Sequence, residues 1–327
     1  MTHRNLVLRH VLRSQDFTRN WLKSFFPEVR ALKKTLETQV GKRTLQRRLR
    51  GRLMYPIFYE PSTRTRFSFC TAAMRLGMSP IWTEDAGKFS SAAKGESLTD
   101  TAHNLLGYGP DVIVMRHFQD GAERVVAEMS DLHYGGIPII NAGSGKDQHP
   151  TQALLDLYTI WDSVGRLDNL TVIIGADVAN GRTCRSLAYL LSRYSGIRII
   201  FVTPPELQPP PDLLTHLDEH GVKWTMTVEL MDALKEADVL YWVRLQAERV
   251  QDVVVRDRLT ESYSNFRIGS EQVAMLRESA IILHPMPIID EVALDVRTNC
   301  PKFRAYEQSA NGLPVRMGLL WELLKDR

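Results

Sequence analysis

The sequence predicts an α/β protein with two doubly wound domains, each built on a central parallel sheet flanked by helices. The first observation behind this is that β-rich runs alternate with helical patterns along most of the chain. Such alternation is typical of parallel strands whose connecting helices cover both faces of a sheet. The second is that 327 residues are enough for two domains, each burying its own core.

The individual elements follow from hydrophobic periodicity and from turn residues. The predicted strands occupy residues 53–59, 111–116, 137–141, 171–175, 197–203, 222–227, 238–244 and 280–284. The predicted helices between them include residues 67–76, 151–164, 183–194 and 229–236. The proline-rich segment 203–212 is expected to be a surface loop.

The N-terminal region is predicted to hold an amphipathic helix. Its apolar residues that fall on or near one helical face are Phe17, Trp21, Leu22, Phe25 and Phe26. The basic residues among 1–27 also bear a weak likeness to a transit peptide. The helical periodicity and the lack of a signal peptide's apolar core favour the helix.

The domain boundary is expected around residues 150–166, where helix 151–164 leaves one sheet and leads to a second that begins at Leu170. This gives domains 1–150 and 151–304. A last helix at about 305–327 carries the apolar residues Leu319, Leu320, Leu323 and Leu324. Because that face needs an apolar partner, we expect it to pack back on the first domain, so that two helices join the domains.

Composition narrows the class of function. A net charge of +3 is too small to indicate a nucleic-acid partner. No stretch of about 18 apolar residues predicts a membrane-spanning helix. The three cysteines, Cys70, Cys184 and Cys300, form neither a C-x-x-C pair nor a zinc-ligand spacing, and their scatter favours a reducing cytoplasm.

The segment Pro61-Ser-Thr-Arg-Thr-Arg66 is the strongest candidate site. It places three hydroxyls and two guanidiniums between a predicted strand and a predicted helix. The start of a helix exposes backbone N–H groups that favour an anion, and Arg64 adds donors suited to phosphate oxygens. The structural alternative is ordinary helix capping, which needs only one hydroxyl. The pattern therefore favours phosphate binding.

Four more polar segments fall at strand ends or helix starts. Arg116 ends a predicted strand, while His149 and Gln152 lie where a loop enters a helix. Arg182 opens a helix and Arg244 closes a strand, and two such guanidiniums suit an acceptor with two carboxylates. Taken singly, each has a structural or solvated alternative. No spacing of acids predicts a metal site.

Three motifs carry a resemblance to a known family. The segments are Pro61–Arg66, His149-Pro-Thr-Gln152 and His284-Pro-Met-Pro287. In order and spacing they resemble the signatures of the aspartate/ornithine carbamoyltransferase family. Asn180-Gly-Arg-Thr183 and Arg244-Leu-Gln246 resemble the aspartate branch, whereas the ornithine branch's His-Cys-Leu-Pro loop is absent.

The resemblance implies that domain 1–150 binds carbamoyl phosphate and that domain 151–304 binds the amino acid, aspartate. It also implies roles residue by residue. It implies that carbamoyl phosphate is bound by Ser62, Thr63, Arg64, Thr65, Ser90, Lys94, Arg116, His149, Gln152 and Met286. It implies that aspartate is bound by Lys94, Arg182, Arg244, Gln246 and Pro287. The residues implied to act in catalysis are Arg64, Thr65, Lys94, Arg116 and His149.

The resemblance also implies a reaction and an assembly. The expected reaction moves the carbamoyl group of carbamoyl phosphate to the α-amine of L-aspartate, an early step towards pyrimidines, with domain closure and without a metal or organic cofactor. The expected assembly is a homotrimer whose active sites are shared between subunits, with regulatory chains left open. Ile288 and Val243 depart from the family pattern near the acceptor side. Another acceptor amine and a non-catalytic metabolite binder therefore remain alternatives.

Overall fold

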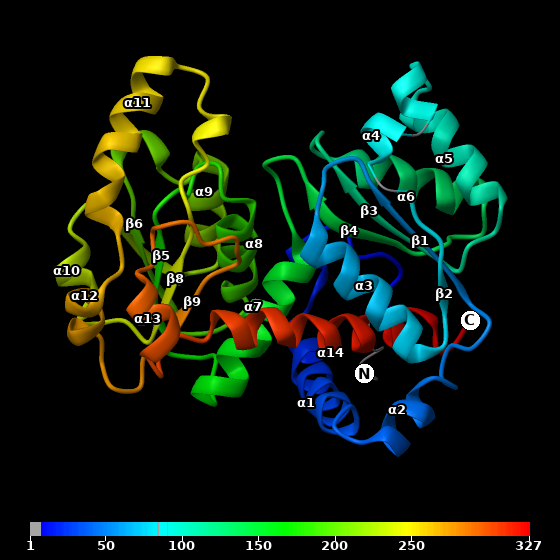
Figure 1. The fold of residues 1–327 in the computed structure, drawn as a ribbon, viewed down its shortest axis with the longest axis horizontal. Helices are drawn as coiled ribbons and strands as arrows, with labels where there is room; N and C mark the ends of the chain where they lie inside the picture. Colours follow the sequence, from blue (N-terminus) through cyan, green and yellow to red (C-terminus); the bar gives the residue numbers. More distant parts are fainter. Residues whose placement is uncertain (1–7, 84, 90) are drawn as a thin grey trace. The chain divides into compact units, whose positions relative to one another are not determined.

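The computed structural model describes residues 8–83, 85–89 and 91–327. The chain divides into two compact units, Met1–Thr151 with Asn311–Arg327, and Gln152–Ala310. The division falls inside two continuous helices, α7 (Pro150–Val164) and α14 (Ala305–Leu324) (Figure 1). Which ligand each unit binds stays a prediction.

The first unit contains a parallel sheet in the order β2-β1-β3-β4 within the described residues. Its strands are β1 (Leu53–Phe58), β2 (Ser79–Pro80), β3 (Val112–His117) and β4 (Ile139–Ser144). The predicted strands of this half are confirmed, with small shifts of their ends. Strand β2 was missed because two residues are too few to show a period of two.

Helices cover both faces of this sheet. On one face, Ile57, Ile113 and Ile139 pack against α5 (Leu98–Gly107) and α6 (Ala122–His133). On the other face lie α3 (Thr63–Leu76), α1 (Arg19–Thr35) and the last part of α14. Alternate residues of a strand point to opposite faces of the sheet. Because helices cover both faces, the residues on both sides of these short strands are apolar.

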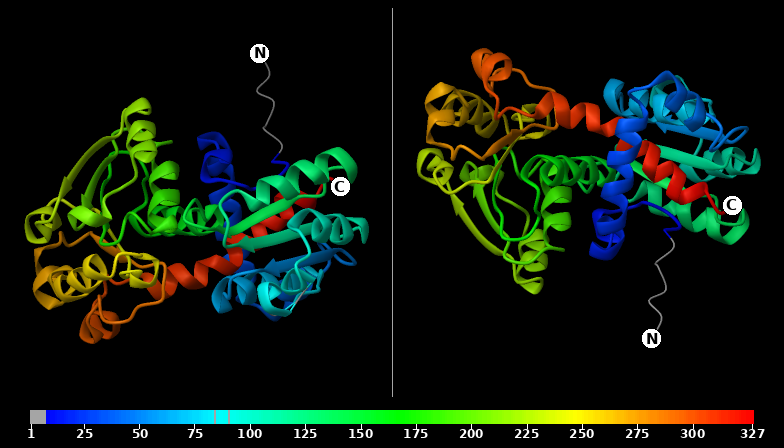
Figure 2. Two further views of the ribbon diagram at one scale, coloured as in Figure 1. Left: turned by 90° about the horizontal axis from the view of Figure 1, so that it is seen from above. Right: turned by 90° about the horizontal axis from the view of Figure 1, so that it is seen from below.

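The last turns of α14 belong to the first unit, where the C-terminus also lies (Figure 2). A β-carbon at Gly318 would lie 2.9 Å from the ring of Phe25 on α1, so glycine permits the close approach of these helices. Arg316 Nη1 donates to Ser68 Oγ on α3 at 2.7 Å.

The predicted amphipathic N-terminal helix is confirmed as α1, and Thr18 caps it by accepting from the backbone N–H of Trp21 at 3.2 Å. Leu22, Phe25 and Phe26 are buried. Phe17 is also buried but precedes the helix. The remaining short elements of this unit are η1 (Ser14–Asp16), α2 (Gln39–Leu45), α4 (Ala86–Phe89) and η2 (Ser91–Lys94).

The second unit contains a parallel sheet in the order β7-β6-β5-β8-β9 in the part of the chain that the structure describes. The strands are β5 (Thr171–Gly175), β6 (Arg198–Val202), β7 (Lys223–Thr227), β8 (Val239–Trp242) and β9 (Ile281–Leu283). The helices are α8 (Arg182–Leu191), α9 (Pro211–Glu219), α10 (Leu230–Leu234), α11 (Val253–Ser262), α12 (Ser270–Met275) and α13 (Leu294–Asn299). Short 3-10 turns are η3 (Pro205–Leu207), η4 (Ala247–Arg249) and η5 (Tyr263–Phe266).

Three predicted boundaries in this half were wrong in ways that matter for the site. The strand predicted to reach Arg244 ends at Trp242, so Arg244 belongs to the following loop. Helix α8 begins at Arg182 itself. The predicted proline loop is interrupted by η3 and gives way to α9 at Pro211, because proline suits the first turn of a helix. No helix among the described residues is long and apolar enough to span a membrane.

Candidate functional site

The carboxyl ends of β1, β3 and β4 meet at one edge of the first sheet, because the strands are parallel and in register. Phe58 pairs with Arg116, and His117 pairs with Ser144. The Tyr59 N–H donates to the Arg116 carbonyl oxygen at 2.8 Å. In open parallel sheets this is the edge where ligands bind. The segments that carry the first group of predicted residues therefore leave the sheet at one place.

The helix start after β1 has the features that the phosphate prediction requires. Ser62 is the N-cap of α3, yet its side chain makes no capping hydrogen bond. The structural alternative of ordinary capping by this serine is therefore wrong. Thr65 is buried on the first turn, while Thr63 and Arg64 are exposed. The first N–H groups of α3 are thus not occupied by the Ser62 hydroxyl, and an anion would find them with hydroxyls and a guanidinium close by.

Arg116 is held by an acid that the sequence analysis did not single out. Its Nε lies 3.2 Å from Glu60 Oε2, and only 16% of the Arg116 side chain is exposed. Glu60 follows β1 by two residues, so the ion pair ties the end of β3 to the approach to α3. A guanidinium has five N–H donors, so a bond through Nε fixes its orientation without using the whole group.

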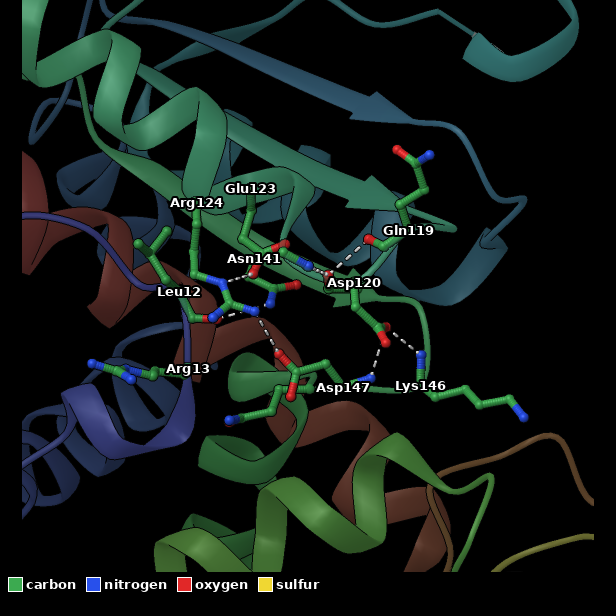
Figure 3. A network of polar contacts seen from close by, with 12 residues as sticks. Leu12, Arg13, Gln119, Asp120, Glu123, Arg124, Asn141, Lys146 and Asp147 are labelled. Carbon is green, nitrogen blue, oxygen red and sulfur yellow. Dashed lines mark hydrogen bonds and ion pairs between the residues drawn. The ribbon is translucent and has the colours of Figure 1, made fainter. Parts of the chain in front are cut away.

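The loop that leads from β4 to His149 is braced from the start of α6 (Figure 3). Asp120 Oδ1 accepts from the backbone N–H groups of Lys146 at 2.8 Å and Asp147 at 3.1 Å. Arg124 Nη2 donates to Asp147 Oδ2 at 3.3 Å. These contacts fix the path of the loop just before His149, which is 3% exposed.

The same loop is also tied to the segment before α1. Gln148 Oε1 accepts from the backbone N–H of Ser14 at 2.7 Å, and its Nε2 donates to Gln15 Oε1 at 3.0 Å. His149 Nδ1 lies 3.5 Å from the Thr151 hydroxyl, on the first turn of α7. The imidazole is thus part of a buried, bonded frame rather than a solvated loop.

The carboxyl edge of the second sheet gathers the second group of predicted residues. Arg182 begins α8 and is 8% exposed, so the alternative of a solvated surface arginine is wrong for it. Between β5 and α8 lies Asp177, which is fully buried. Its Oδ1 accepts from the Asn180 N–H at 3.0 Å, and its Oδ2 accepts from the Gln246 N–H at 2.9 Å. Burial raises the pKa of Asp177, an effect that these bonds oppose.

Arg244 and Gln246 follow β8, which pairs directly with β5. The Arg244 guanidinium is already bonded to a carboxylate, because it pairs with Glu248 four residues later in the chain. The hydrogen bond to Glu248 raises the pKa of Arg244. One quarter of the Arg244 side chain remains exposed. The pairing shows that this guanidinium is placed to hold a carboxylate.

Gln152 is oriented by a buried acid on its own helix. Its Nε2 donates to Asp156 Oδ1 at 2.7 Å. Asp156 is fully buried and also accepts from Gln308 Nε2 at 2.6 Å and from the Tyr241 hydroxyl at 2.8 Å. Since the Gln152 N–H₂ group faces Asp156, its amide oxygen is the end that remains to accept a hydrogen bond from an NH₂ group.

The loop after β9 brings Met286 and Pro287 to the same sheet edge. His284 Nδ1 accepts from the Met286 N–H at 2.9 Å, which leaves the ring proton on Nε2, 2.8 Å from Glu291 Oε1. Met286 has a left-handed backbone (φ 63°). Ile288, which departs from the family pattern, packs against the core of this unit. Val243, the other departure, is buried.

The remaining two predicted residues are Ser90 and Lys94. Ser90 lies outside the described residues, and Lys94 is exposed at the end of η2. The preceding helix α4 approaches the end of β1, since a β-carbon at Gly87 would lie 3.1 Å from the Tyr59 carbonyl oxygen.

Burial raises the pKa of the Cys184 thiol well above its usual value, so this cysteine is a core side chain rather than a nucleophile.

The carboxylates of the site were the residues that sequence reasoning missed. They are Glu60, Asp156, Asp177, Glu248 and Glu291. A helical spacing of four residues could have indicated one of the pairs, Gln152 with Asp156 on α7. The contacts of Glu60 with Arg116 and of Asp177 with Gln246 span long sequence distances and left no local signal.

Comparisons with known proteins agree across the whole chain. The domain described as "Aspartate/ornithine carbamoyltransferase, carbamoyl-P binding domain" matches residues 9–162, and the "Asp/Orn binding domain" matches residues 168–323. The chain is 41% identical to the chloroplastic aspartate carbamoyltransferase of Arabidopsis thaliana, over 97% of this chain and 78% of that one.

Solved structures give the same picture. The chain is similar to the catalytic subunit of aspartate transcarbamoylase from M. jannaschii, with a TM-score of 0.85 and 38% identity, covering 98% of this chain and 99% of that one. It is also similar to the Trypanosoma cruzi enzyme solved with carbamoyl aspartate and phosphate, with a TM-score of 0.87 and 33% identity over 98% and 97% of the two chains. The chain therefore belongs to the aspartate/ornithine carbamoyltransferase family.

Proposed function

We propose that this chain transfers the carbamoyl group of carbamoyl phosphate to the α-amine of L-aspartate, giving N-carbamoyl-L-aspartate and phosphate. The observation that carries the proposal is that each unit of this family member holds one of the two predicted groups of residues, here called half-sites. One half-site offers an uncapped helix start with Arg64 and a braced Arg116. The other offers two arginines, Arg182 and Arg244, at one sheet edge. The product would feed pyrimidine synthesis.

The first half-site supplies the electrophile. The amine attacks the carbonyl carbon, the C–N bond forms, and negative charge grows on the carbonyl oxygen. Arg116, His149 and Thr65 donate hydrogen bonds to that oxygen, and removing one such donor typically raises a barrier by about 3–4 kcal/mol. The bond to phosphate then breaks, and the leaving phosphate takes the proton of the amine at the Ser62–Arg66 turn. Gln152 accepts from the carbamoyl NH₂ through the oxygen that Asp156 leaves available.

The second half-site selects the acceptor. Arg182 and Arg244 hold the two carboxylates of aspartate, and Gln246 adds a polar contact. Glu248 holds the Arg244 guanidinium in position until the substrate carboxylate shares it. Because the amine must reach the carbonyl carbon, both half-sites have to act on the same pair of substrates.

A colorimetric ureido assay with carbamoyl phosphate and a panel of amines tests the proposal. Turnover with L-aspartate, and little with ornithine or other amino acids, is the expected result. Turnover only with another amine would assign the chain to a different acceptor, in line with Ile288 and Val243. No turnover with any amine, together with tight binding of a phosphonate analogue, would make it a metabolite binder.

The finer features of assembly and compartment belong to the proposal as well. A homotrimer in which Ser90 and Lys94 serve the neighbouring subunit's site is supported by the motif resemblance and by the exposure of Lys94. Mixing inactive Arg64→Ala and Lys94→Gln chains should regenerate some intact sites and restore part of the activity. If mixing restores nothing, the sites are not shared. Scattered free cysteines favour the cytoplasm, although plant relatives are named chloroplastic, and cell fractionation decides between them.

A further inference from the structure

Two imidazoles and a carboxylate lie together at the C-terminal end of α9. They belong to His216, Glu219 and His220, which are spaced so that they share one face of adjacent helical turns. One potential ligand atom from each lies within 4.8 Å of the others. Glu219 and His220 are exposed and His216 is half-buried. These histidines were not predicted as metal ligands from the sequence, although their spacing of four residues on a helix could have indicated a shared face.

The hydrogen bonds around the two rings fix their tautomers. His220 Nδ1 lies 2.9 Å from the carbonyl oxygen of His216, which can only accept, so Nδ1 carries the proton and Nε2 keeps its lone pair. The Ser192 hydroxyl donates to the Tyr189 carbonyl oxygen at 2.8 Å, so it accepts from His216 Nε2 at 3.0 Å. His216 therefore keeps its lone pair on Nδ1. Metal-binding histidines commonly show this arrangement, in which the second ring nitrogen donates to an oxygen.

The charges around the group suit a cation at neutral pH. The nearby charges include the Arg193 guanidinium, which acts on His216. The carbonyl end of a helix carries partial negative charge, and Glu219 adds a carboxylate there. The positive charge of Arg193 opposes the binding of a metal ion. The negative charges of the helix end and of Glu219 favour it.

The group lies at the edge of the sheet opposite to the substrate half-site. Helix α9 follows β6 and precedes β7, and these strands are parallel, so α9 runs back along the sheet and ends where β7 begins. The opposite edge of the sheet holds the carboxyl ends of the strands, which are followed by Arg182, Arg244 and Met286. Figure 1 shows α9 beside α8, from whose C-cap Ser192 reaches His216.

We propose that His216, Glu219 and His220 form a binding site for one divalent transition-metal ion of the zinc type, with water completing the coordination. Imidazole and carboxylate ligands suit such ions, whose bonds of about 2.0–2.2 Å bring ligand atoms to about 3.4 Å from one another. The exposed side chain of Glu219 has the freedom to close that gap. Ser192 acts as a positioning residue for His216.

Isothermal titration of the full chain with zinc chloride tests the site. The wild type should bind one equivalent here, and His220→Ala should weaken this binding about tenfold or more. Ser192→Ala should weaken it by about tenfold, because loss of a bond that orients a ligating histidine typically costs 10- to 100-fold. Glu219→Gln should weaken it less. His133→Ala, which removes an exposed histidine of the first unit, is the matched control and should bind like the wild type.

The outcomes separate this site from the carbamoyl transfer reaction. Carbamoyl transfer by the His220→Ala variant should match that of the wild type, because the group lies at the other edge of the sheet. An absence of saturable zinc binding by the wild type would overturn the proposal. Equal zinc affinity in His220→Ala and the wild type would overturn it as well, by assigning the ion to other residues.

Discussion

Each half-site holds cationic side chains in fixed positions, but the two half-sites do so in different ways. In the first unit, the hydroxyls and Arg64 stand within one short segment at the start of α3, and Arg116 pairs with an acid, Glu60. In the second unit, carboxylates from three different elements hold the predicted binding groups, and two of them, Asp156 and Asp177, are buried while Glu248 is exposed. Asp156 orients Gln152, Asp177 holds the Gln246 backbone, and Glu248 pairs with Arg244.

This difference predicts how each half-site should respond to amino-acid substitutions. A site made from one contiguous helix start depends on donors that touch the ligand, so substitutions there should act on catalysis. A site held by buried acids depends on hydrogen bonds whose loss leaves donors unsatisfied, so substitutions there should act on stability as well. The following substitutions test that contrast.

Arg64→Ala should have the largest effect. Removing a donor to the departing phosphate should lower kcat about 100- to 1000-fold with every acceptor, with little change in the melting temperature. Steady-state kinetics and calorimetry measure the two quantities. Arg43→Ala, an exposed arginine on α2 of the same unit, serves as the control. Retention of most activity by Arg64→Ala would contradict the phosphate assignment.

Asp156→Ala should lower the free energy of unfolding by about 3 kcal/mol or more, because two buried donors, Gln308 and Tyr241, and the part-buried Gln152 lose their acceptor at a typical cost of about 1–3 kcal/mol each. Tyr241→Phe, which removes one of these donors, should cost about 1 kcal/mol. Denaturant titration gives both values, with the exposed Asp257→Ala as control. If Asp156→Ala and Asp257→Ala unfolded at the same denaturant concentration, the proposed role of the buried acid would be wrong.

Arg244→Ala should raise the KM for aspartate about 10- to 100-fold, the loss expected for a hydrogen bond to a charged group. The KM for carbamoyl phosphate should change much less. Initial rates at varied concentrations of each substrate separate the two constants, and Arg256→Ala on α11 is the control. Equal changes in both KM values would count against a role in binding the acceptor.

Glu248→Gln should have the smallest effect, a rise of about 2- to 5-fold in the KM for aspartate, because a partly exposed ion pair contributes about 0.2–1 kcal/mol. The direction of the change in KM decides between two roles of Glu248. A rise means that Glu248 positions Arg244, whereas a fall means that it competes with the substrate carboxylate. The same kinetic assay distinguishes them.

Much of the fold could be predicted from the sequence because its strands are short, apolar runs separated by helices. Strand β5 was predicted at its observed bounds, and α7 within one residue. Strand β2 could not be predicted, since two residues at a sheet edge carry no periodicity. The end of β8 was placed too late because Val243 continues the apolar run, although it pairs its N–H with Gly175 after the strand ends.

The candidate site was predictable only where its residues stand together in sequence. The Ser62–Arg66 turn was visible because hydroxyls and guanidiniums crowd a strand-to-helix junction. The acids that hold the cations were not visible, because Glu60 meets Arg116 only through the pairing of β1 with β3. Such contacts arise from sheet topology, which a linear pattern does not contain.

The split of the first unit between residues 1–151 and 311–327 has a consequence for synthesis on the ribosome. Residues 152–310 can complete their core while the polypeptide is still growing. Residues 1–151 are made earlier, but their core stays incomplete until residues 311–327 have been synthesised. During that interval the apolar faces of Phe25 and Val29 lack the backbone of Gly318 that later covers them. The part translated first is thus the part finished last, and it is where a nascent-chain chaperone would be needed.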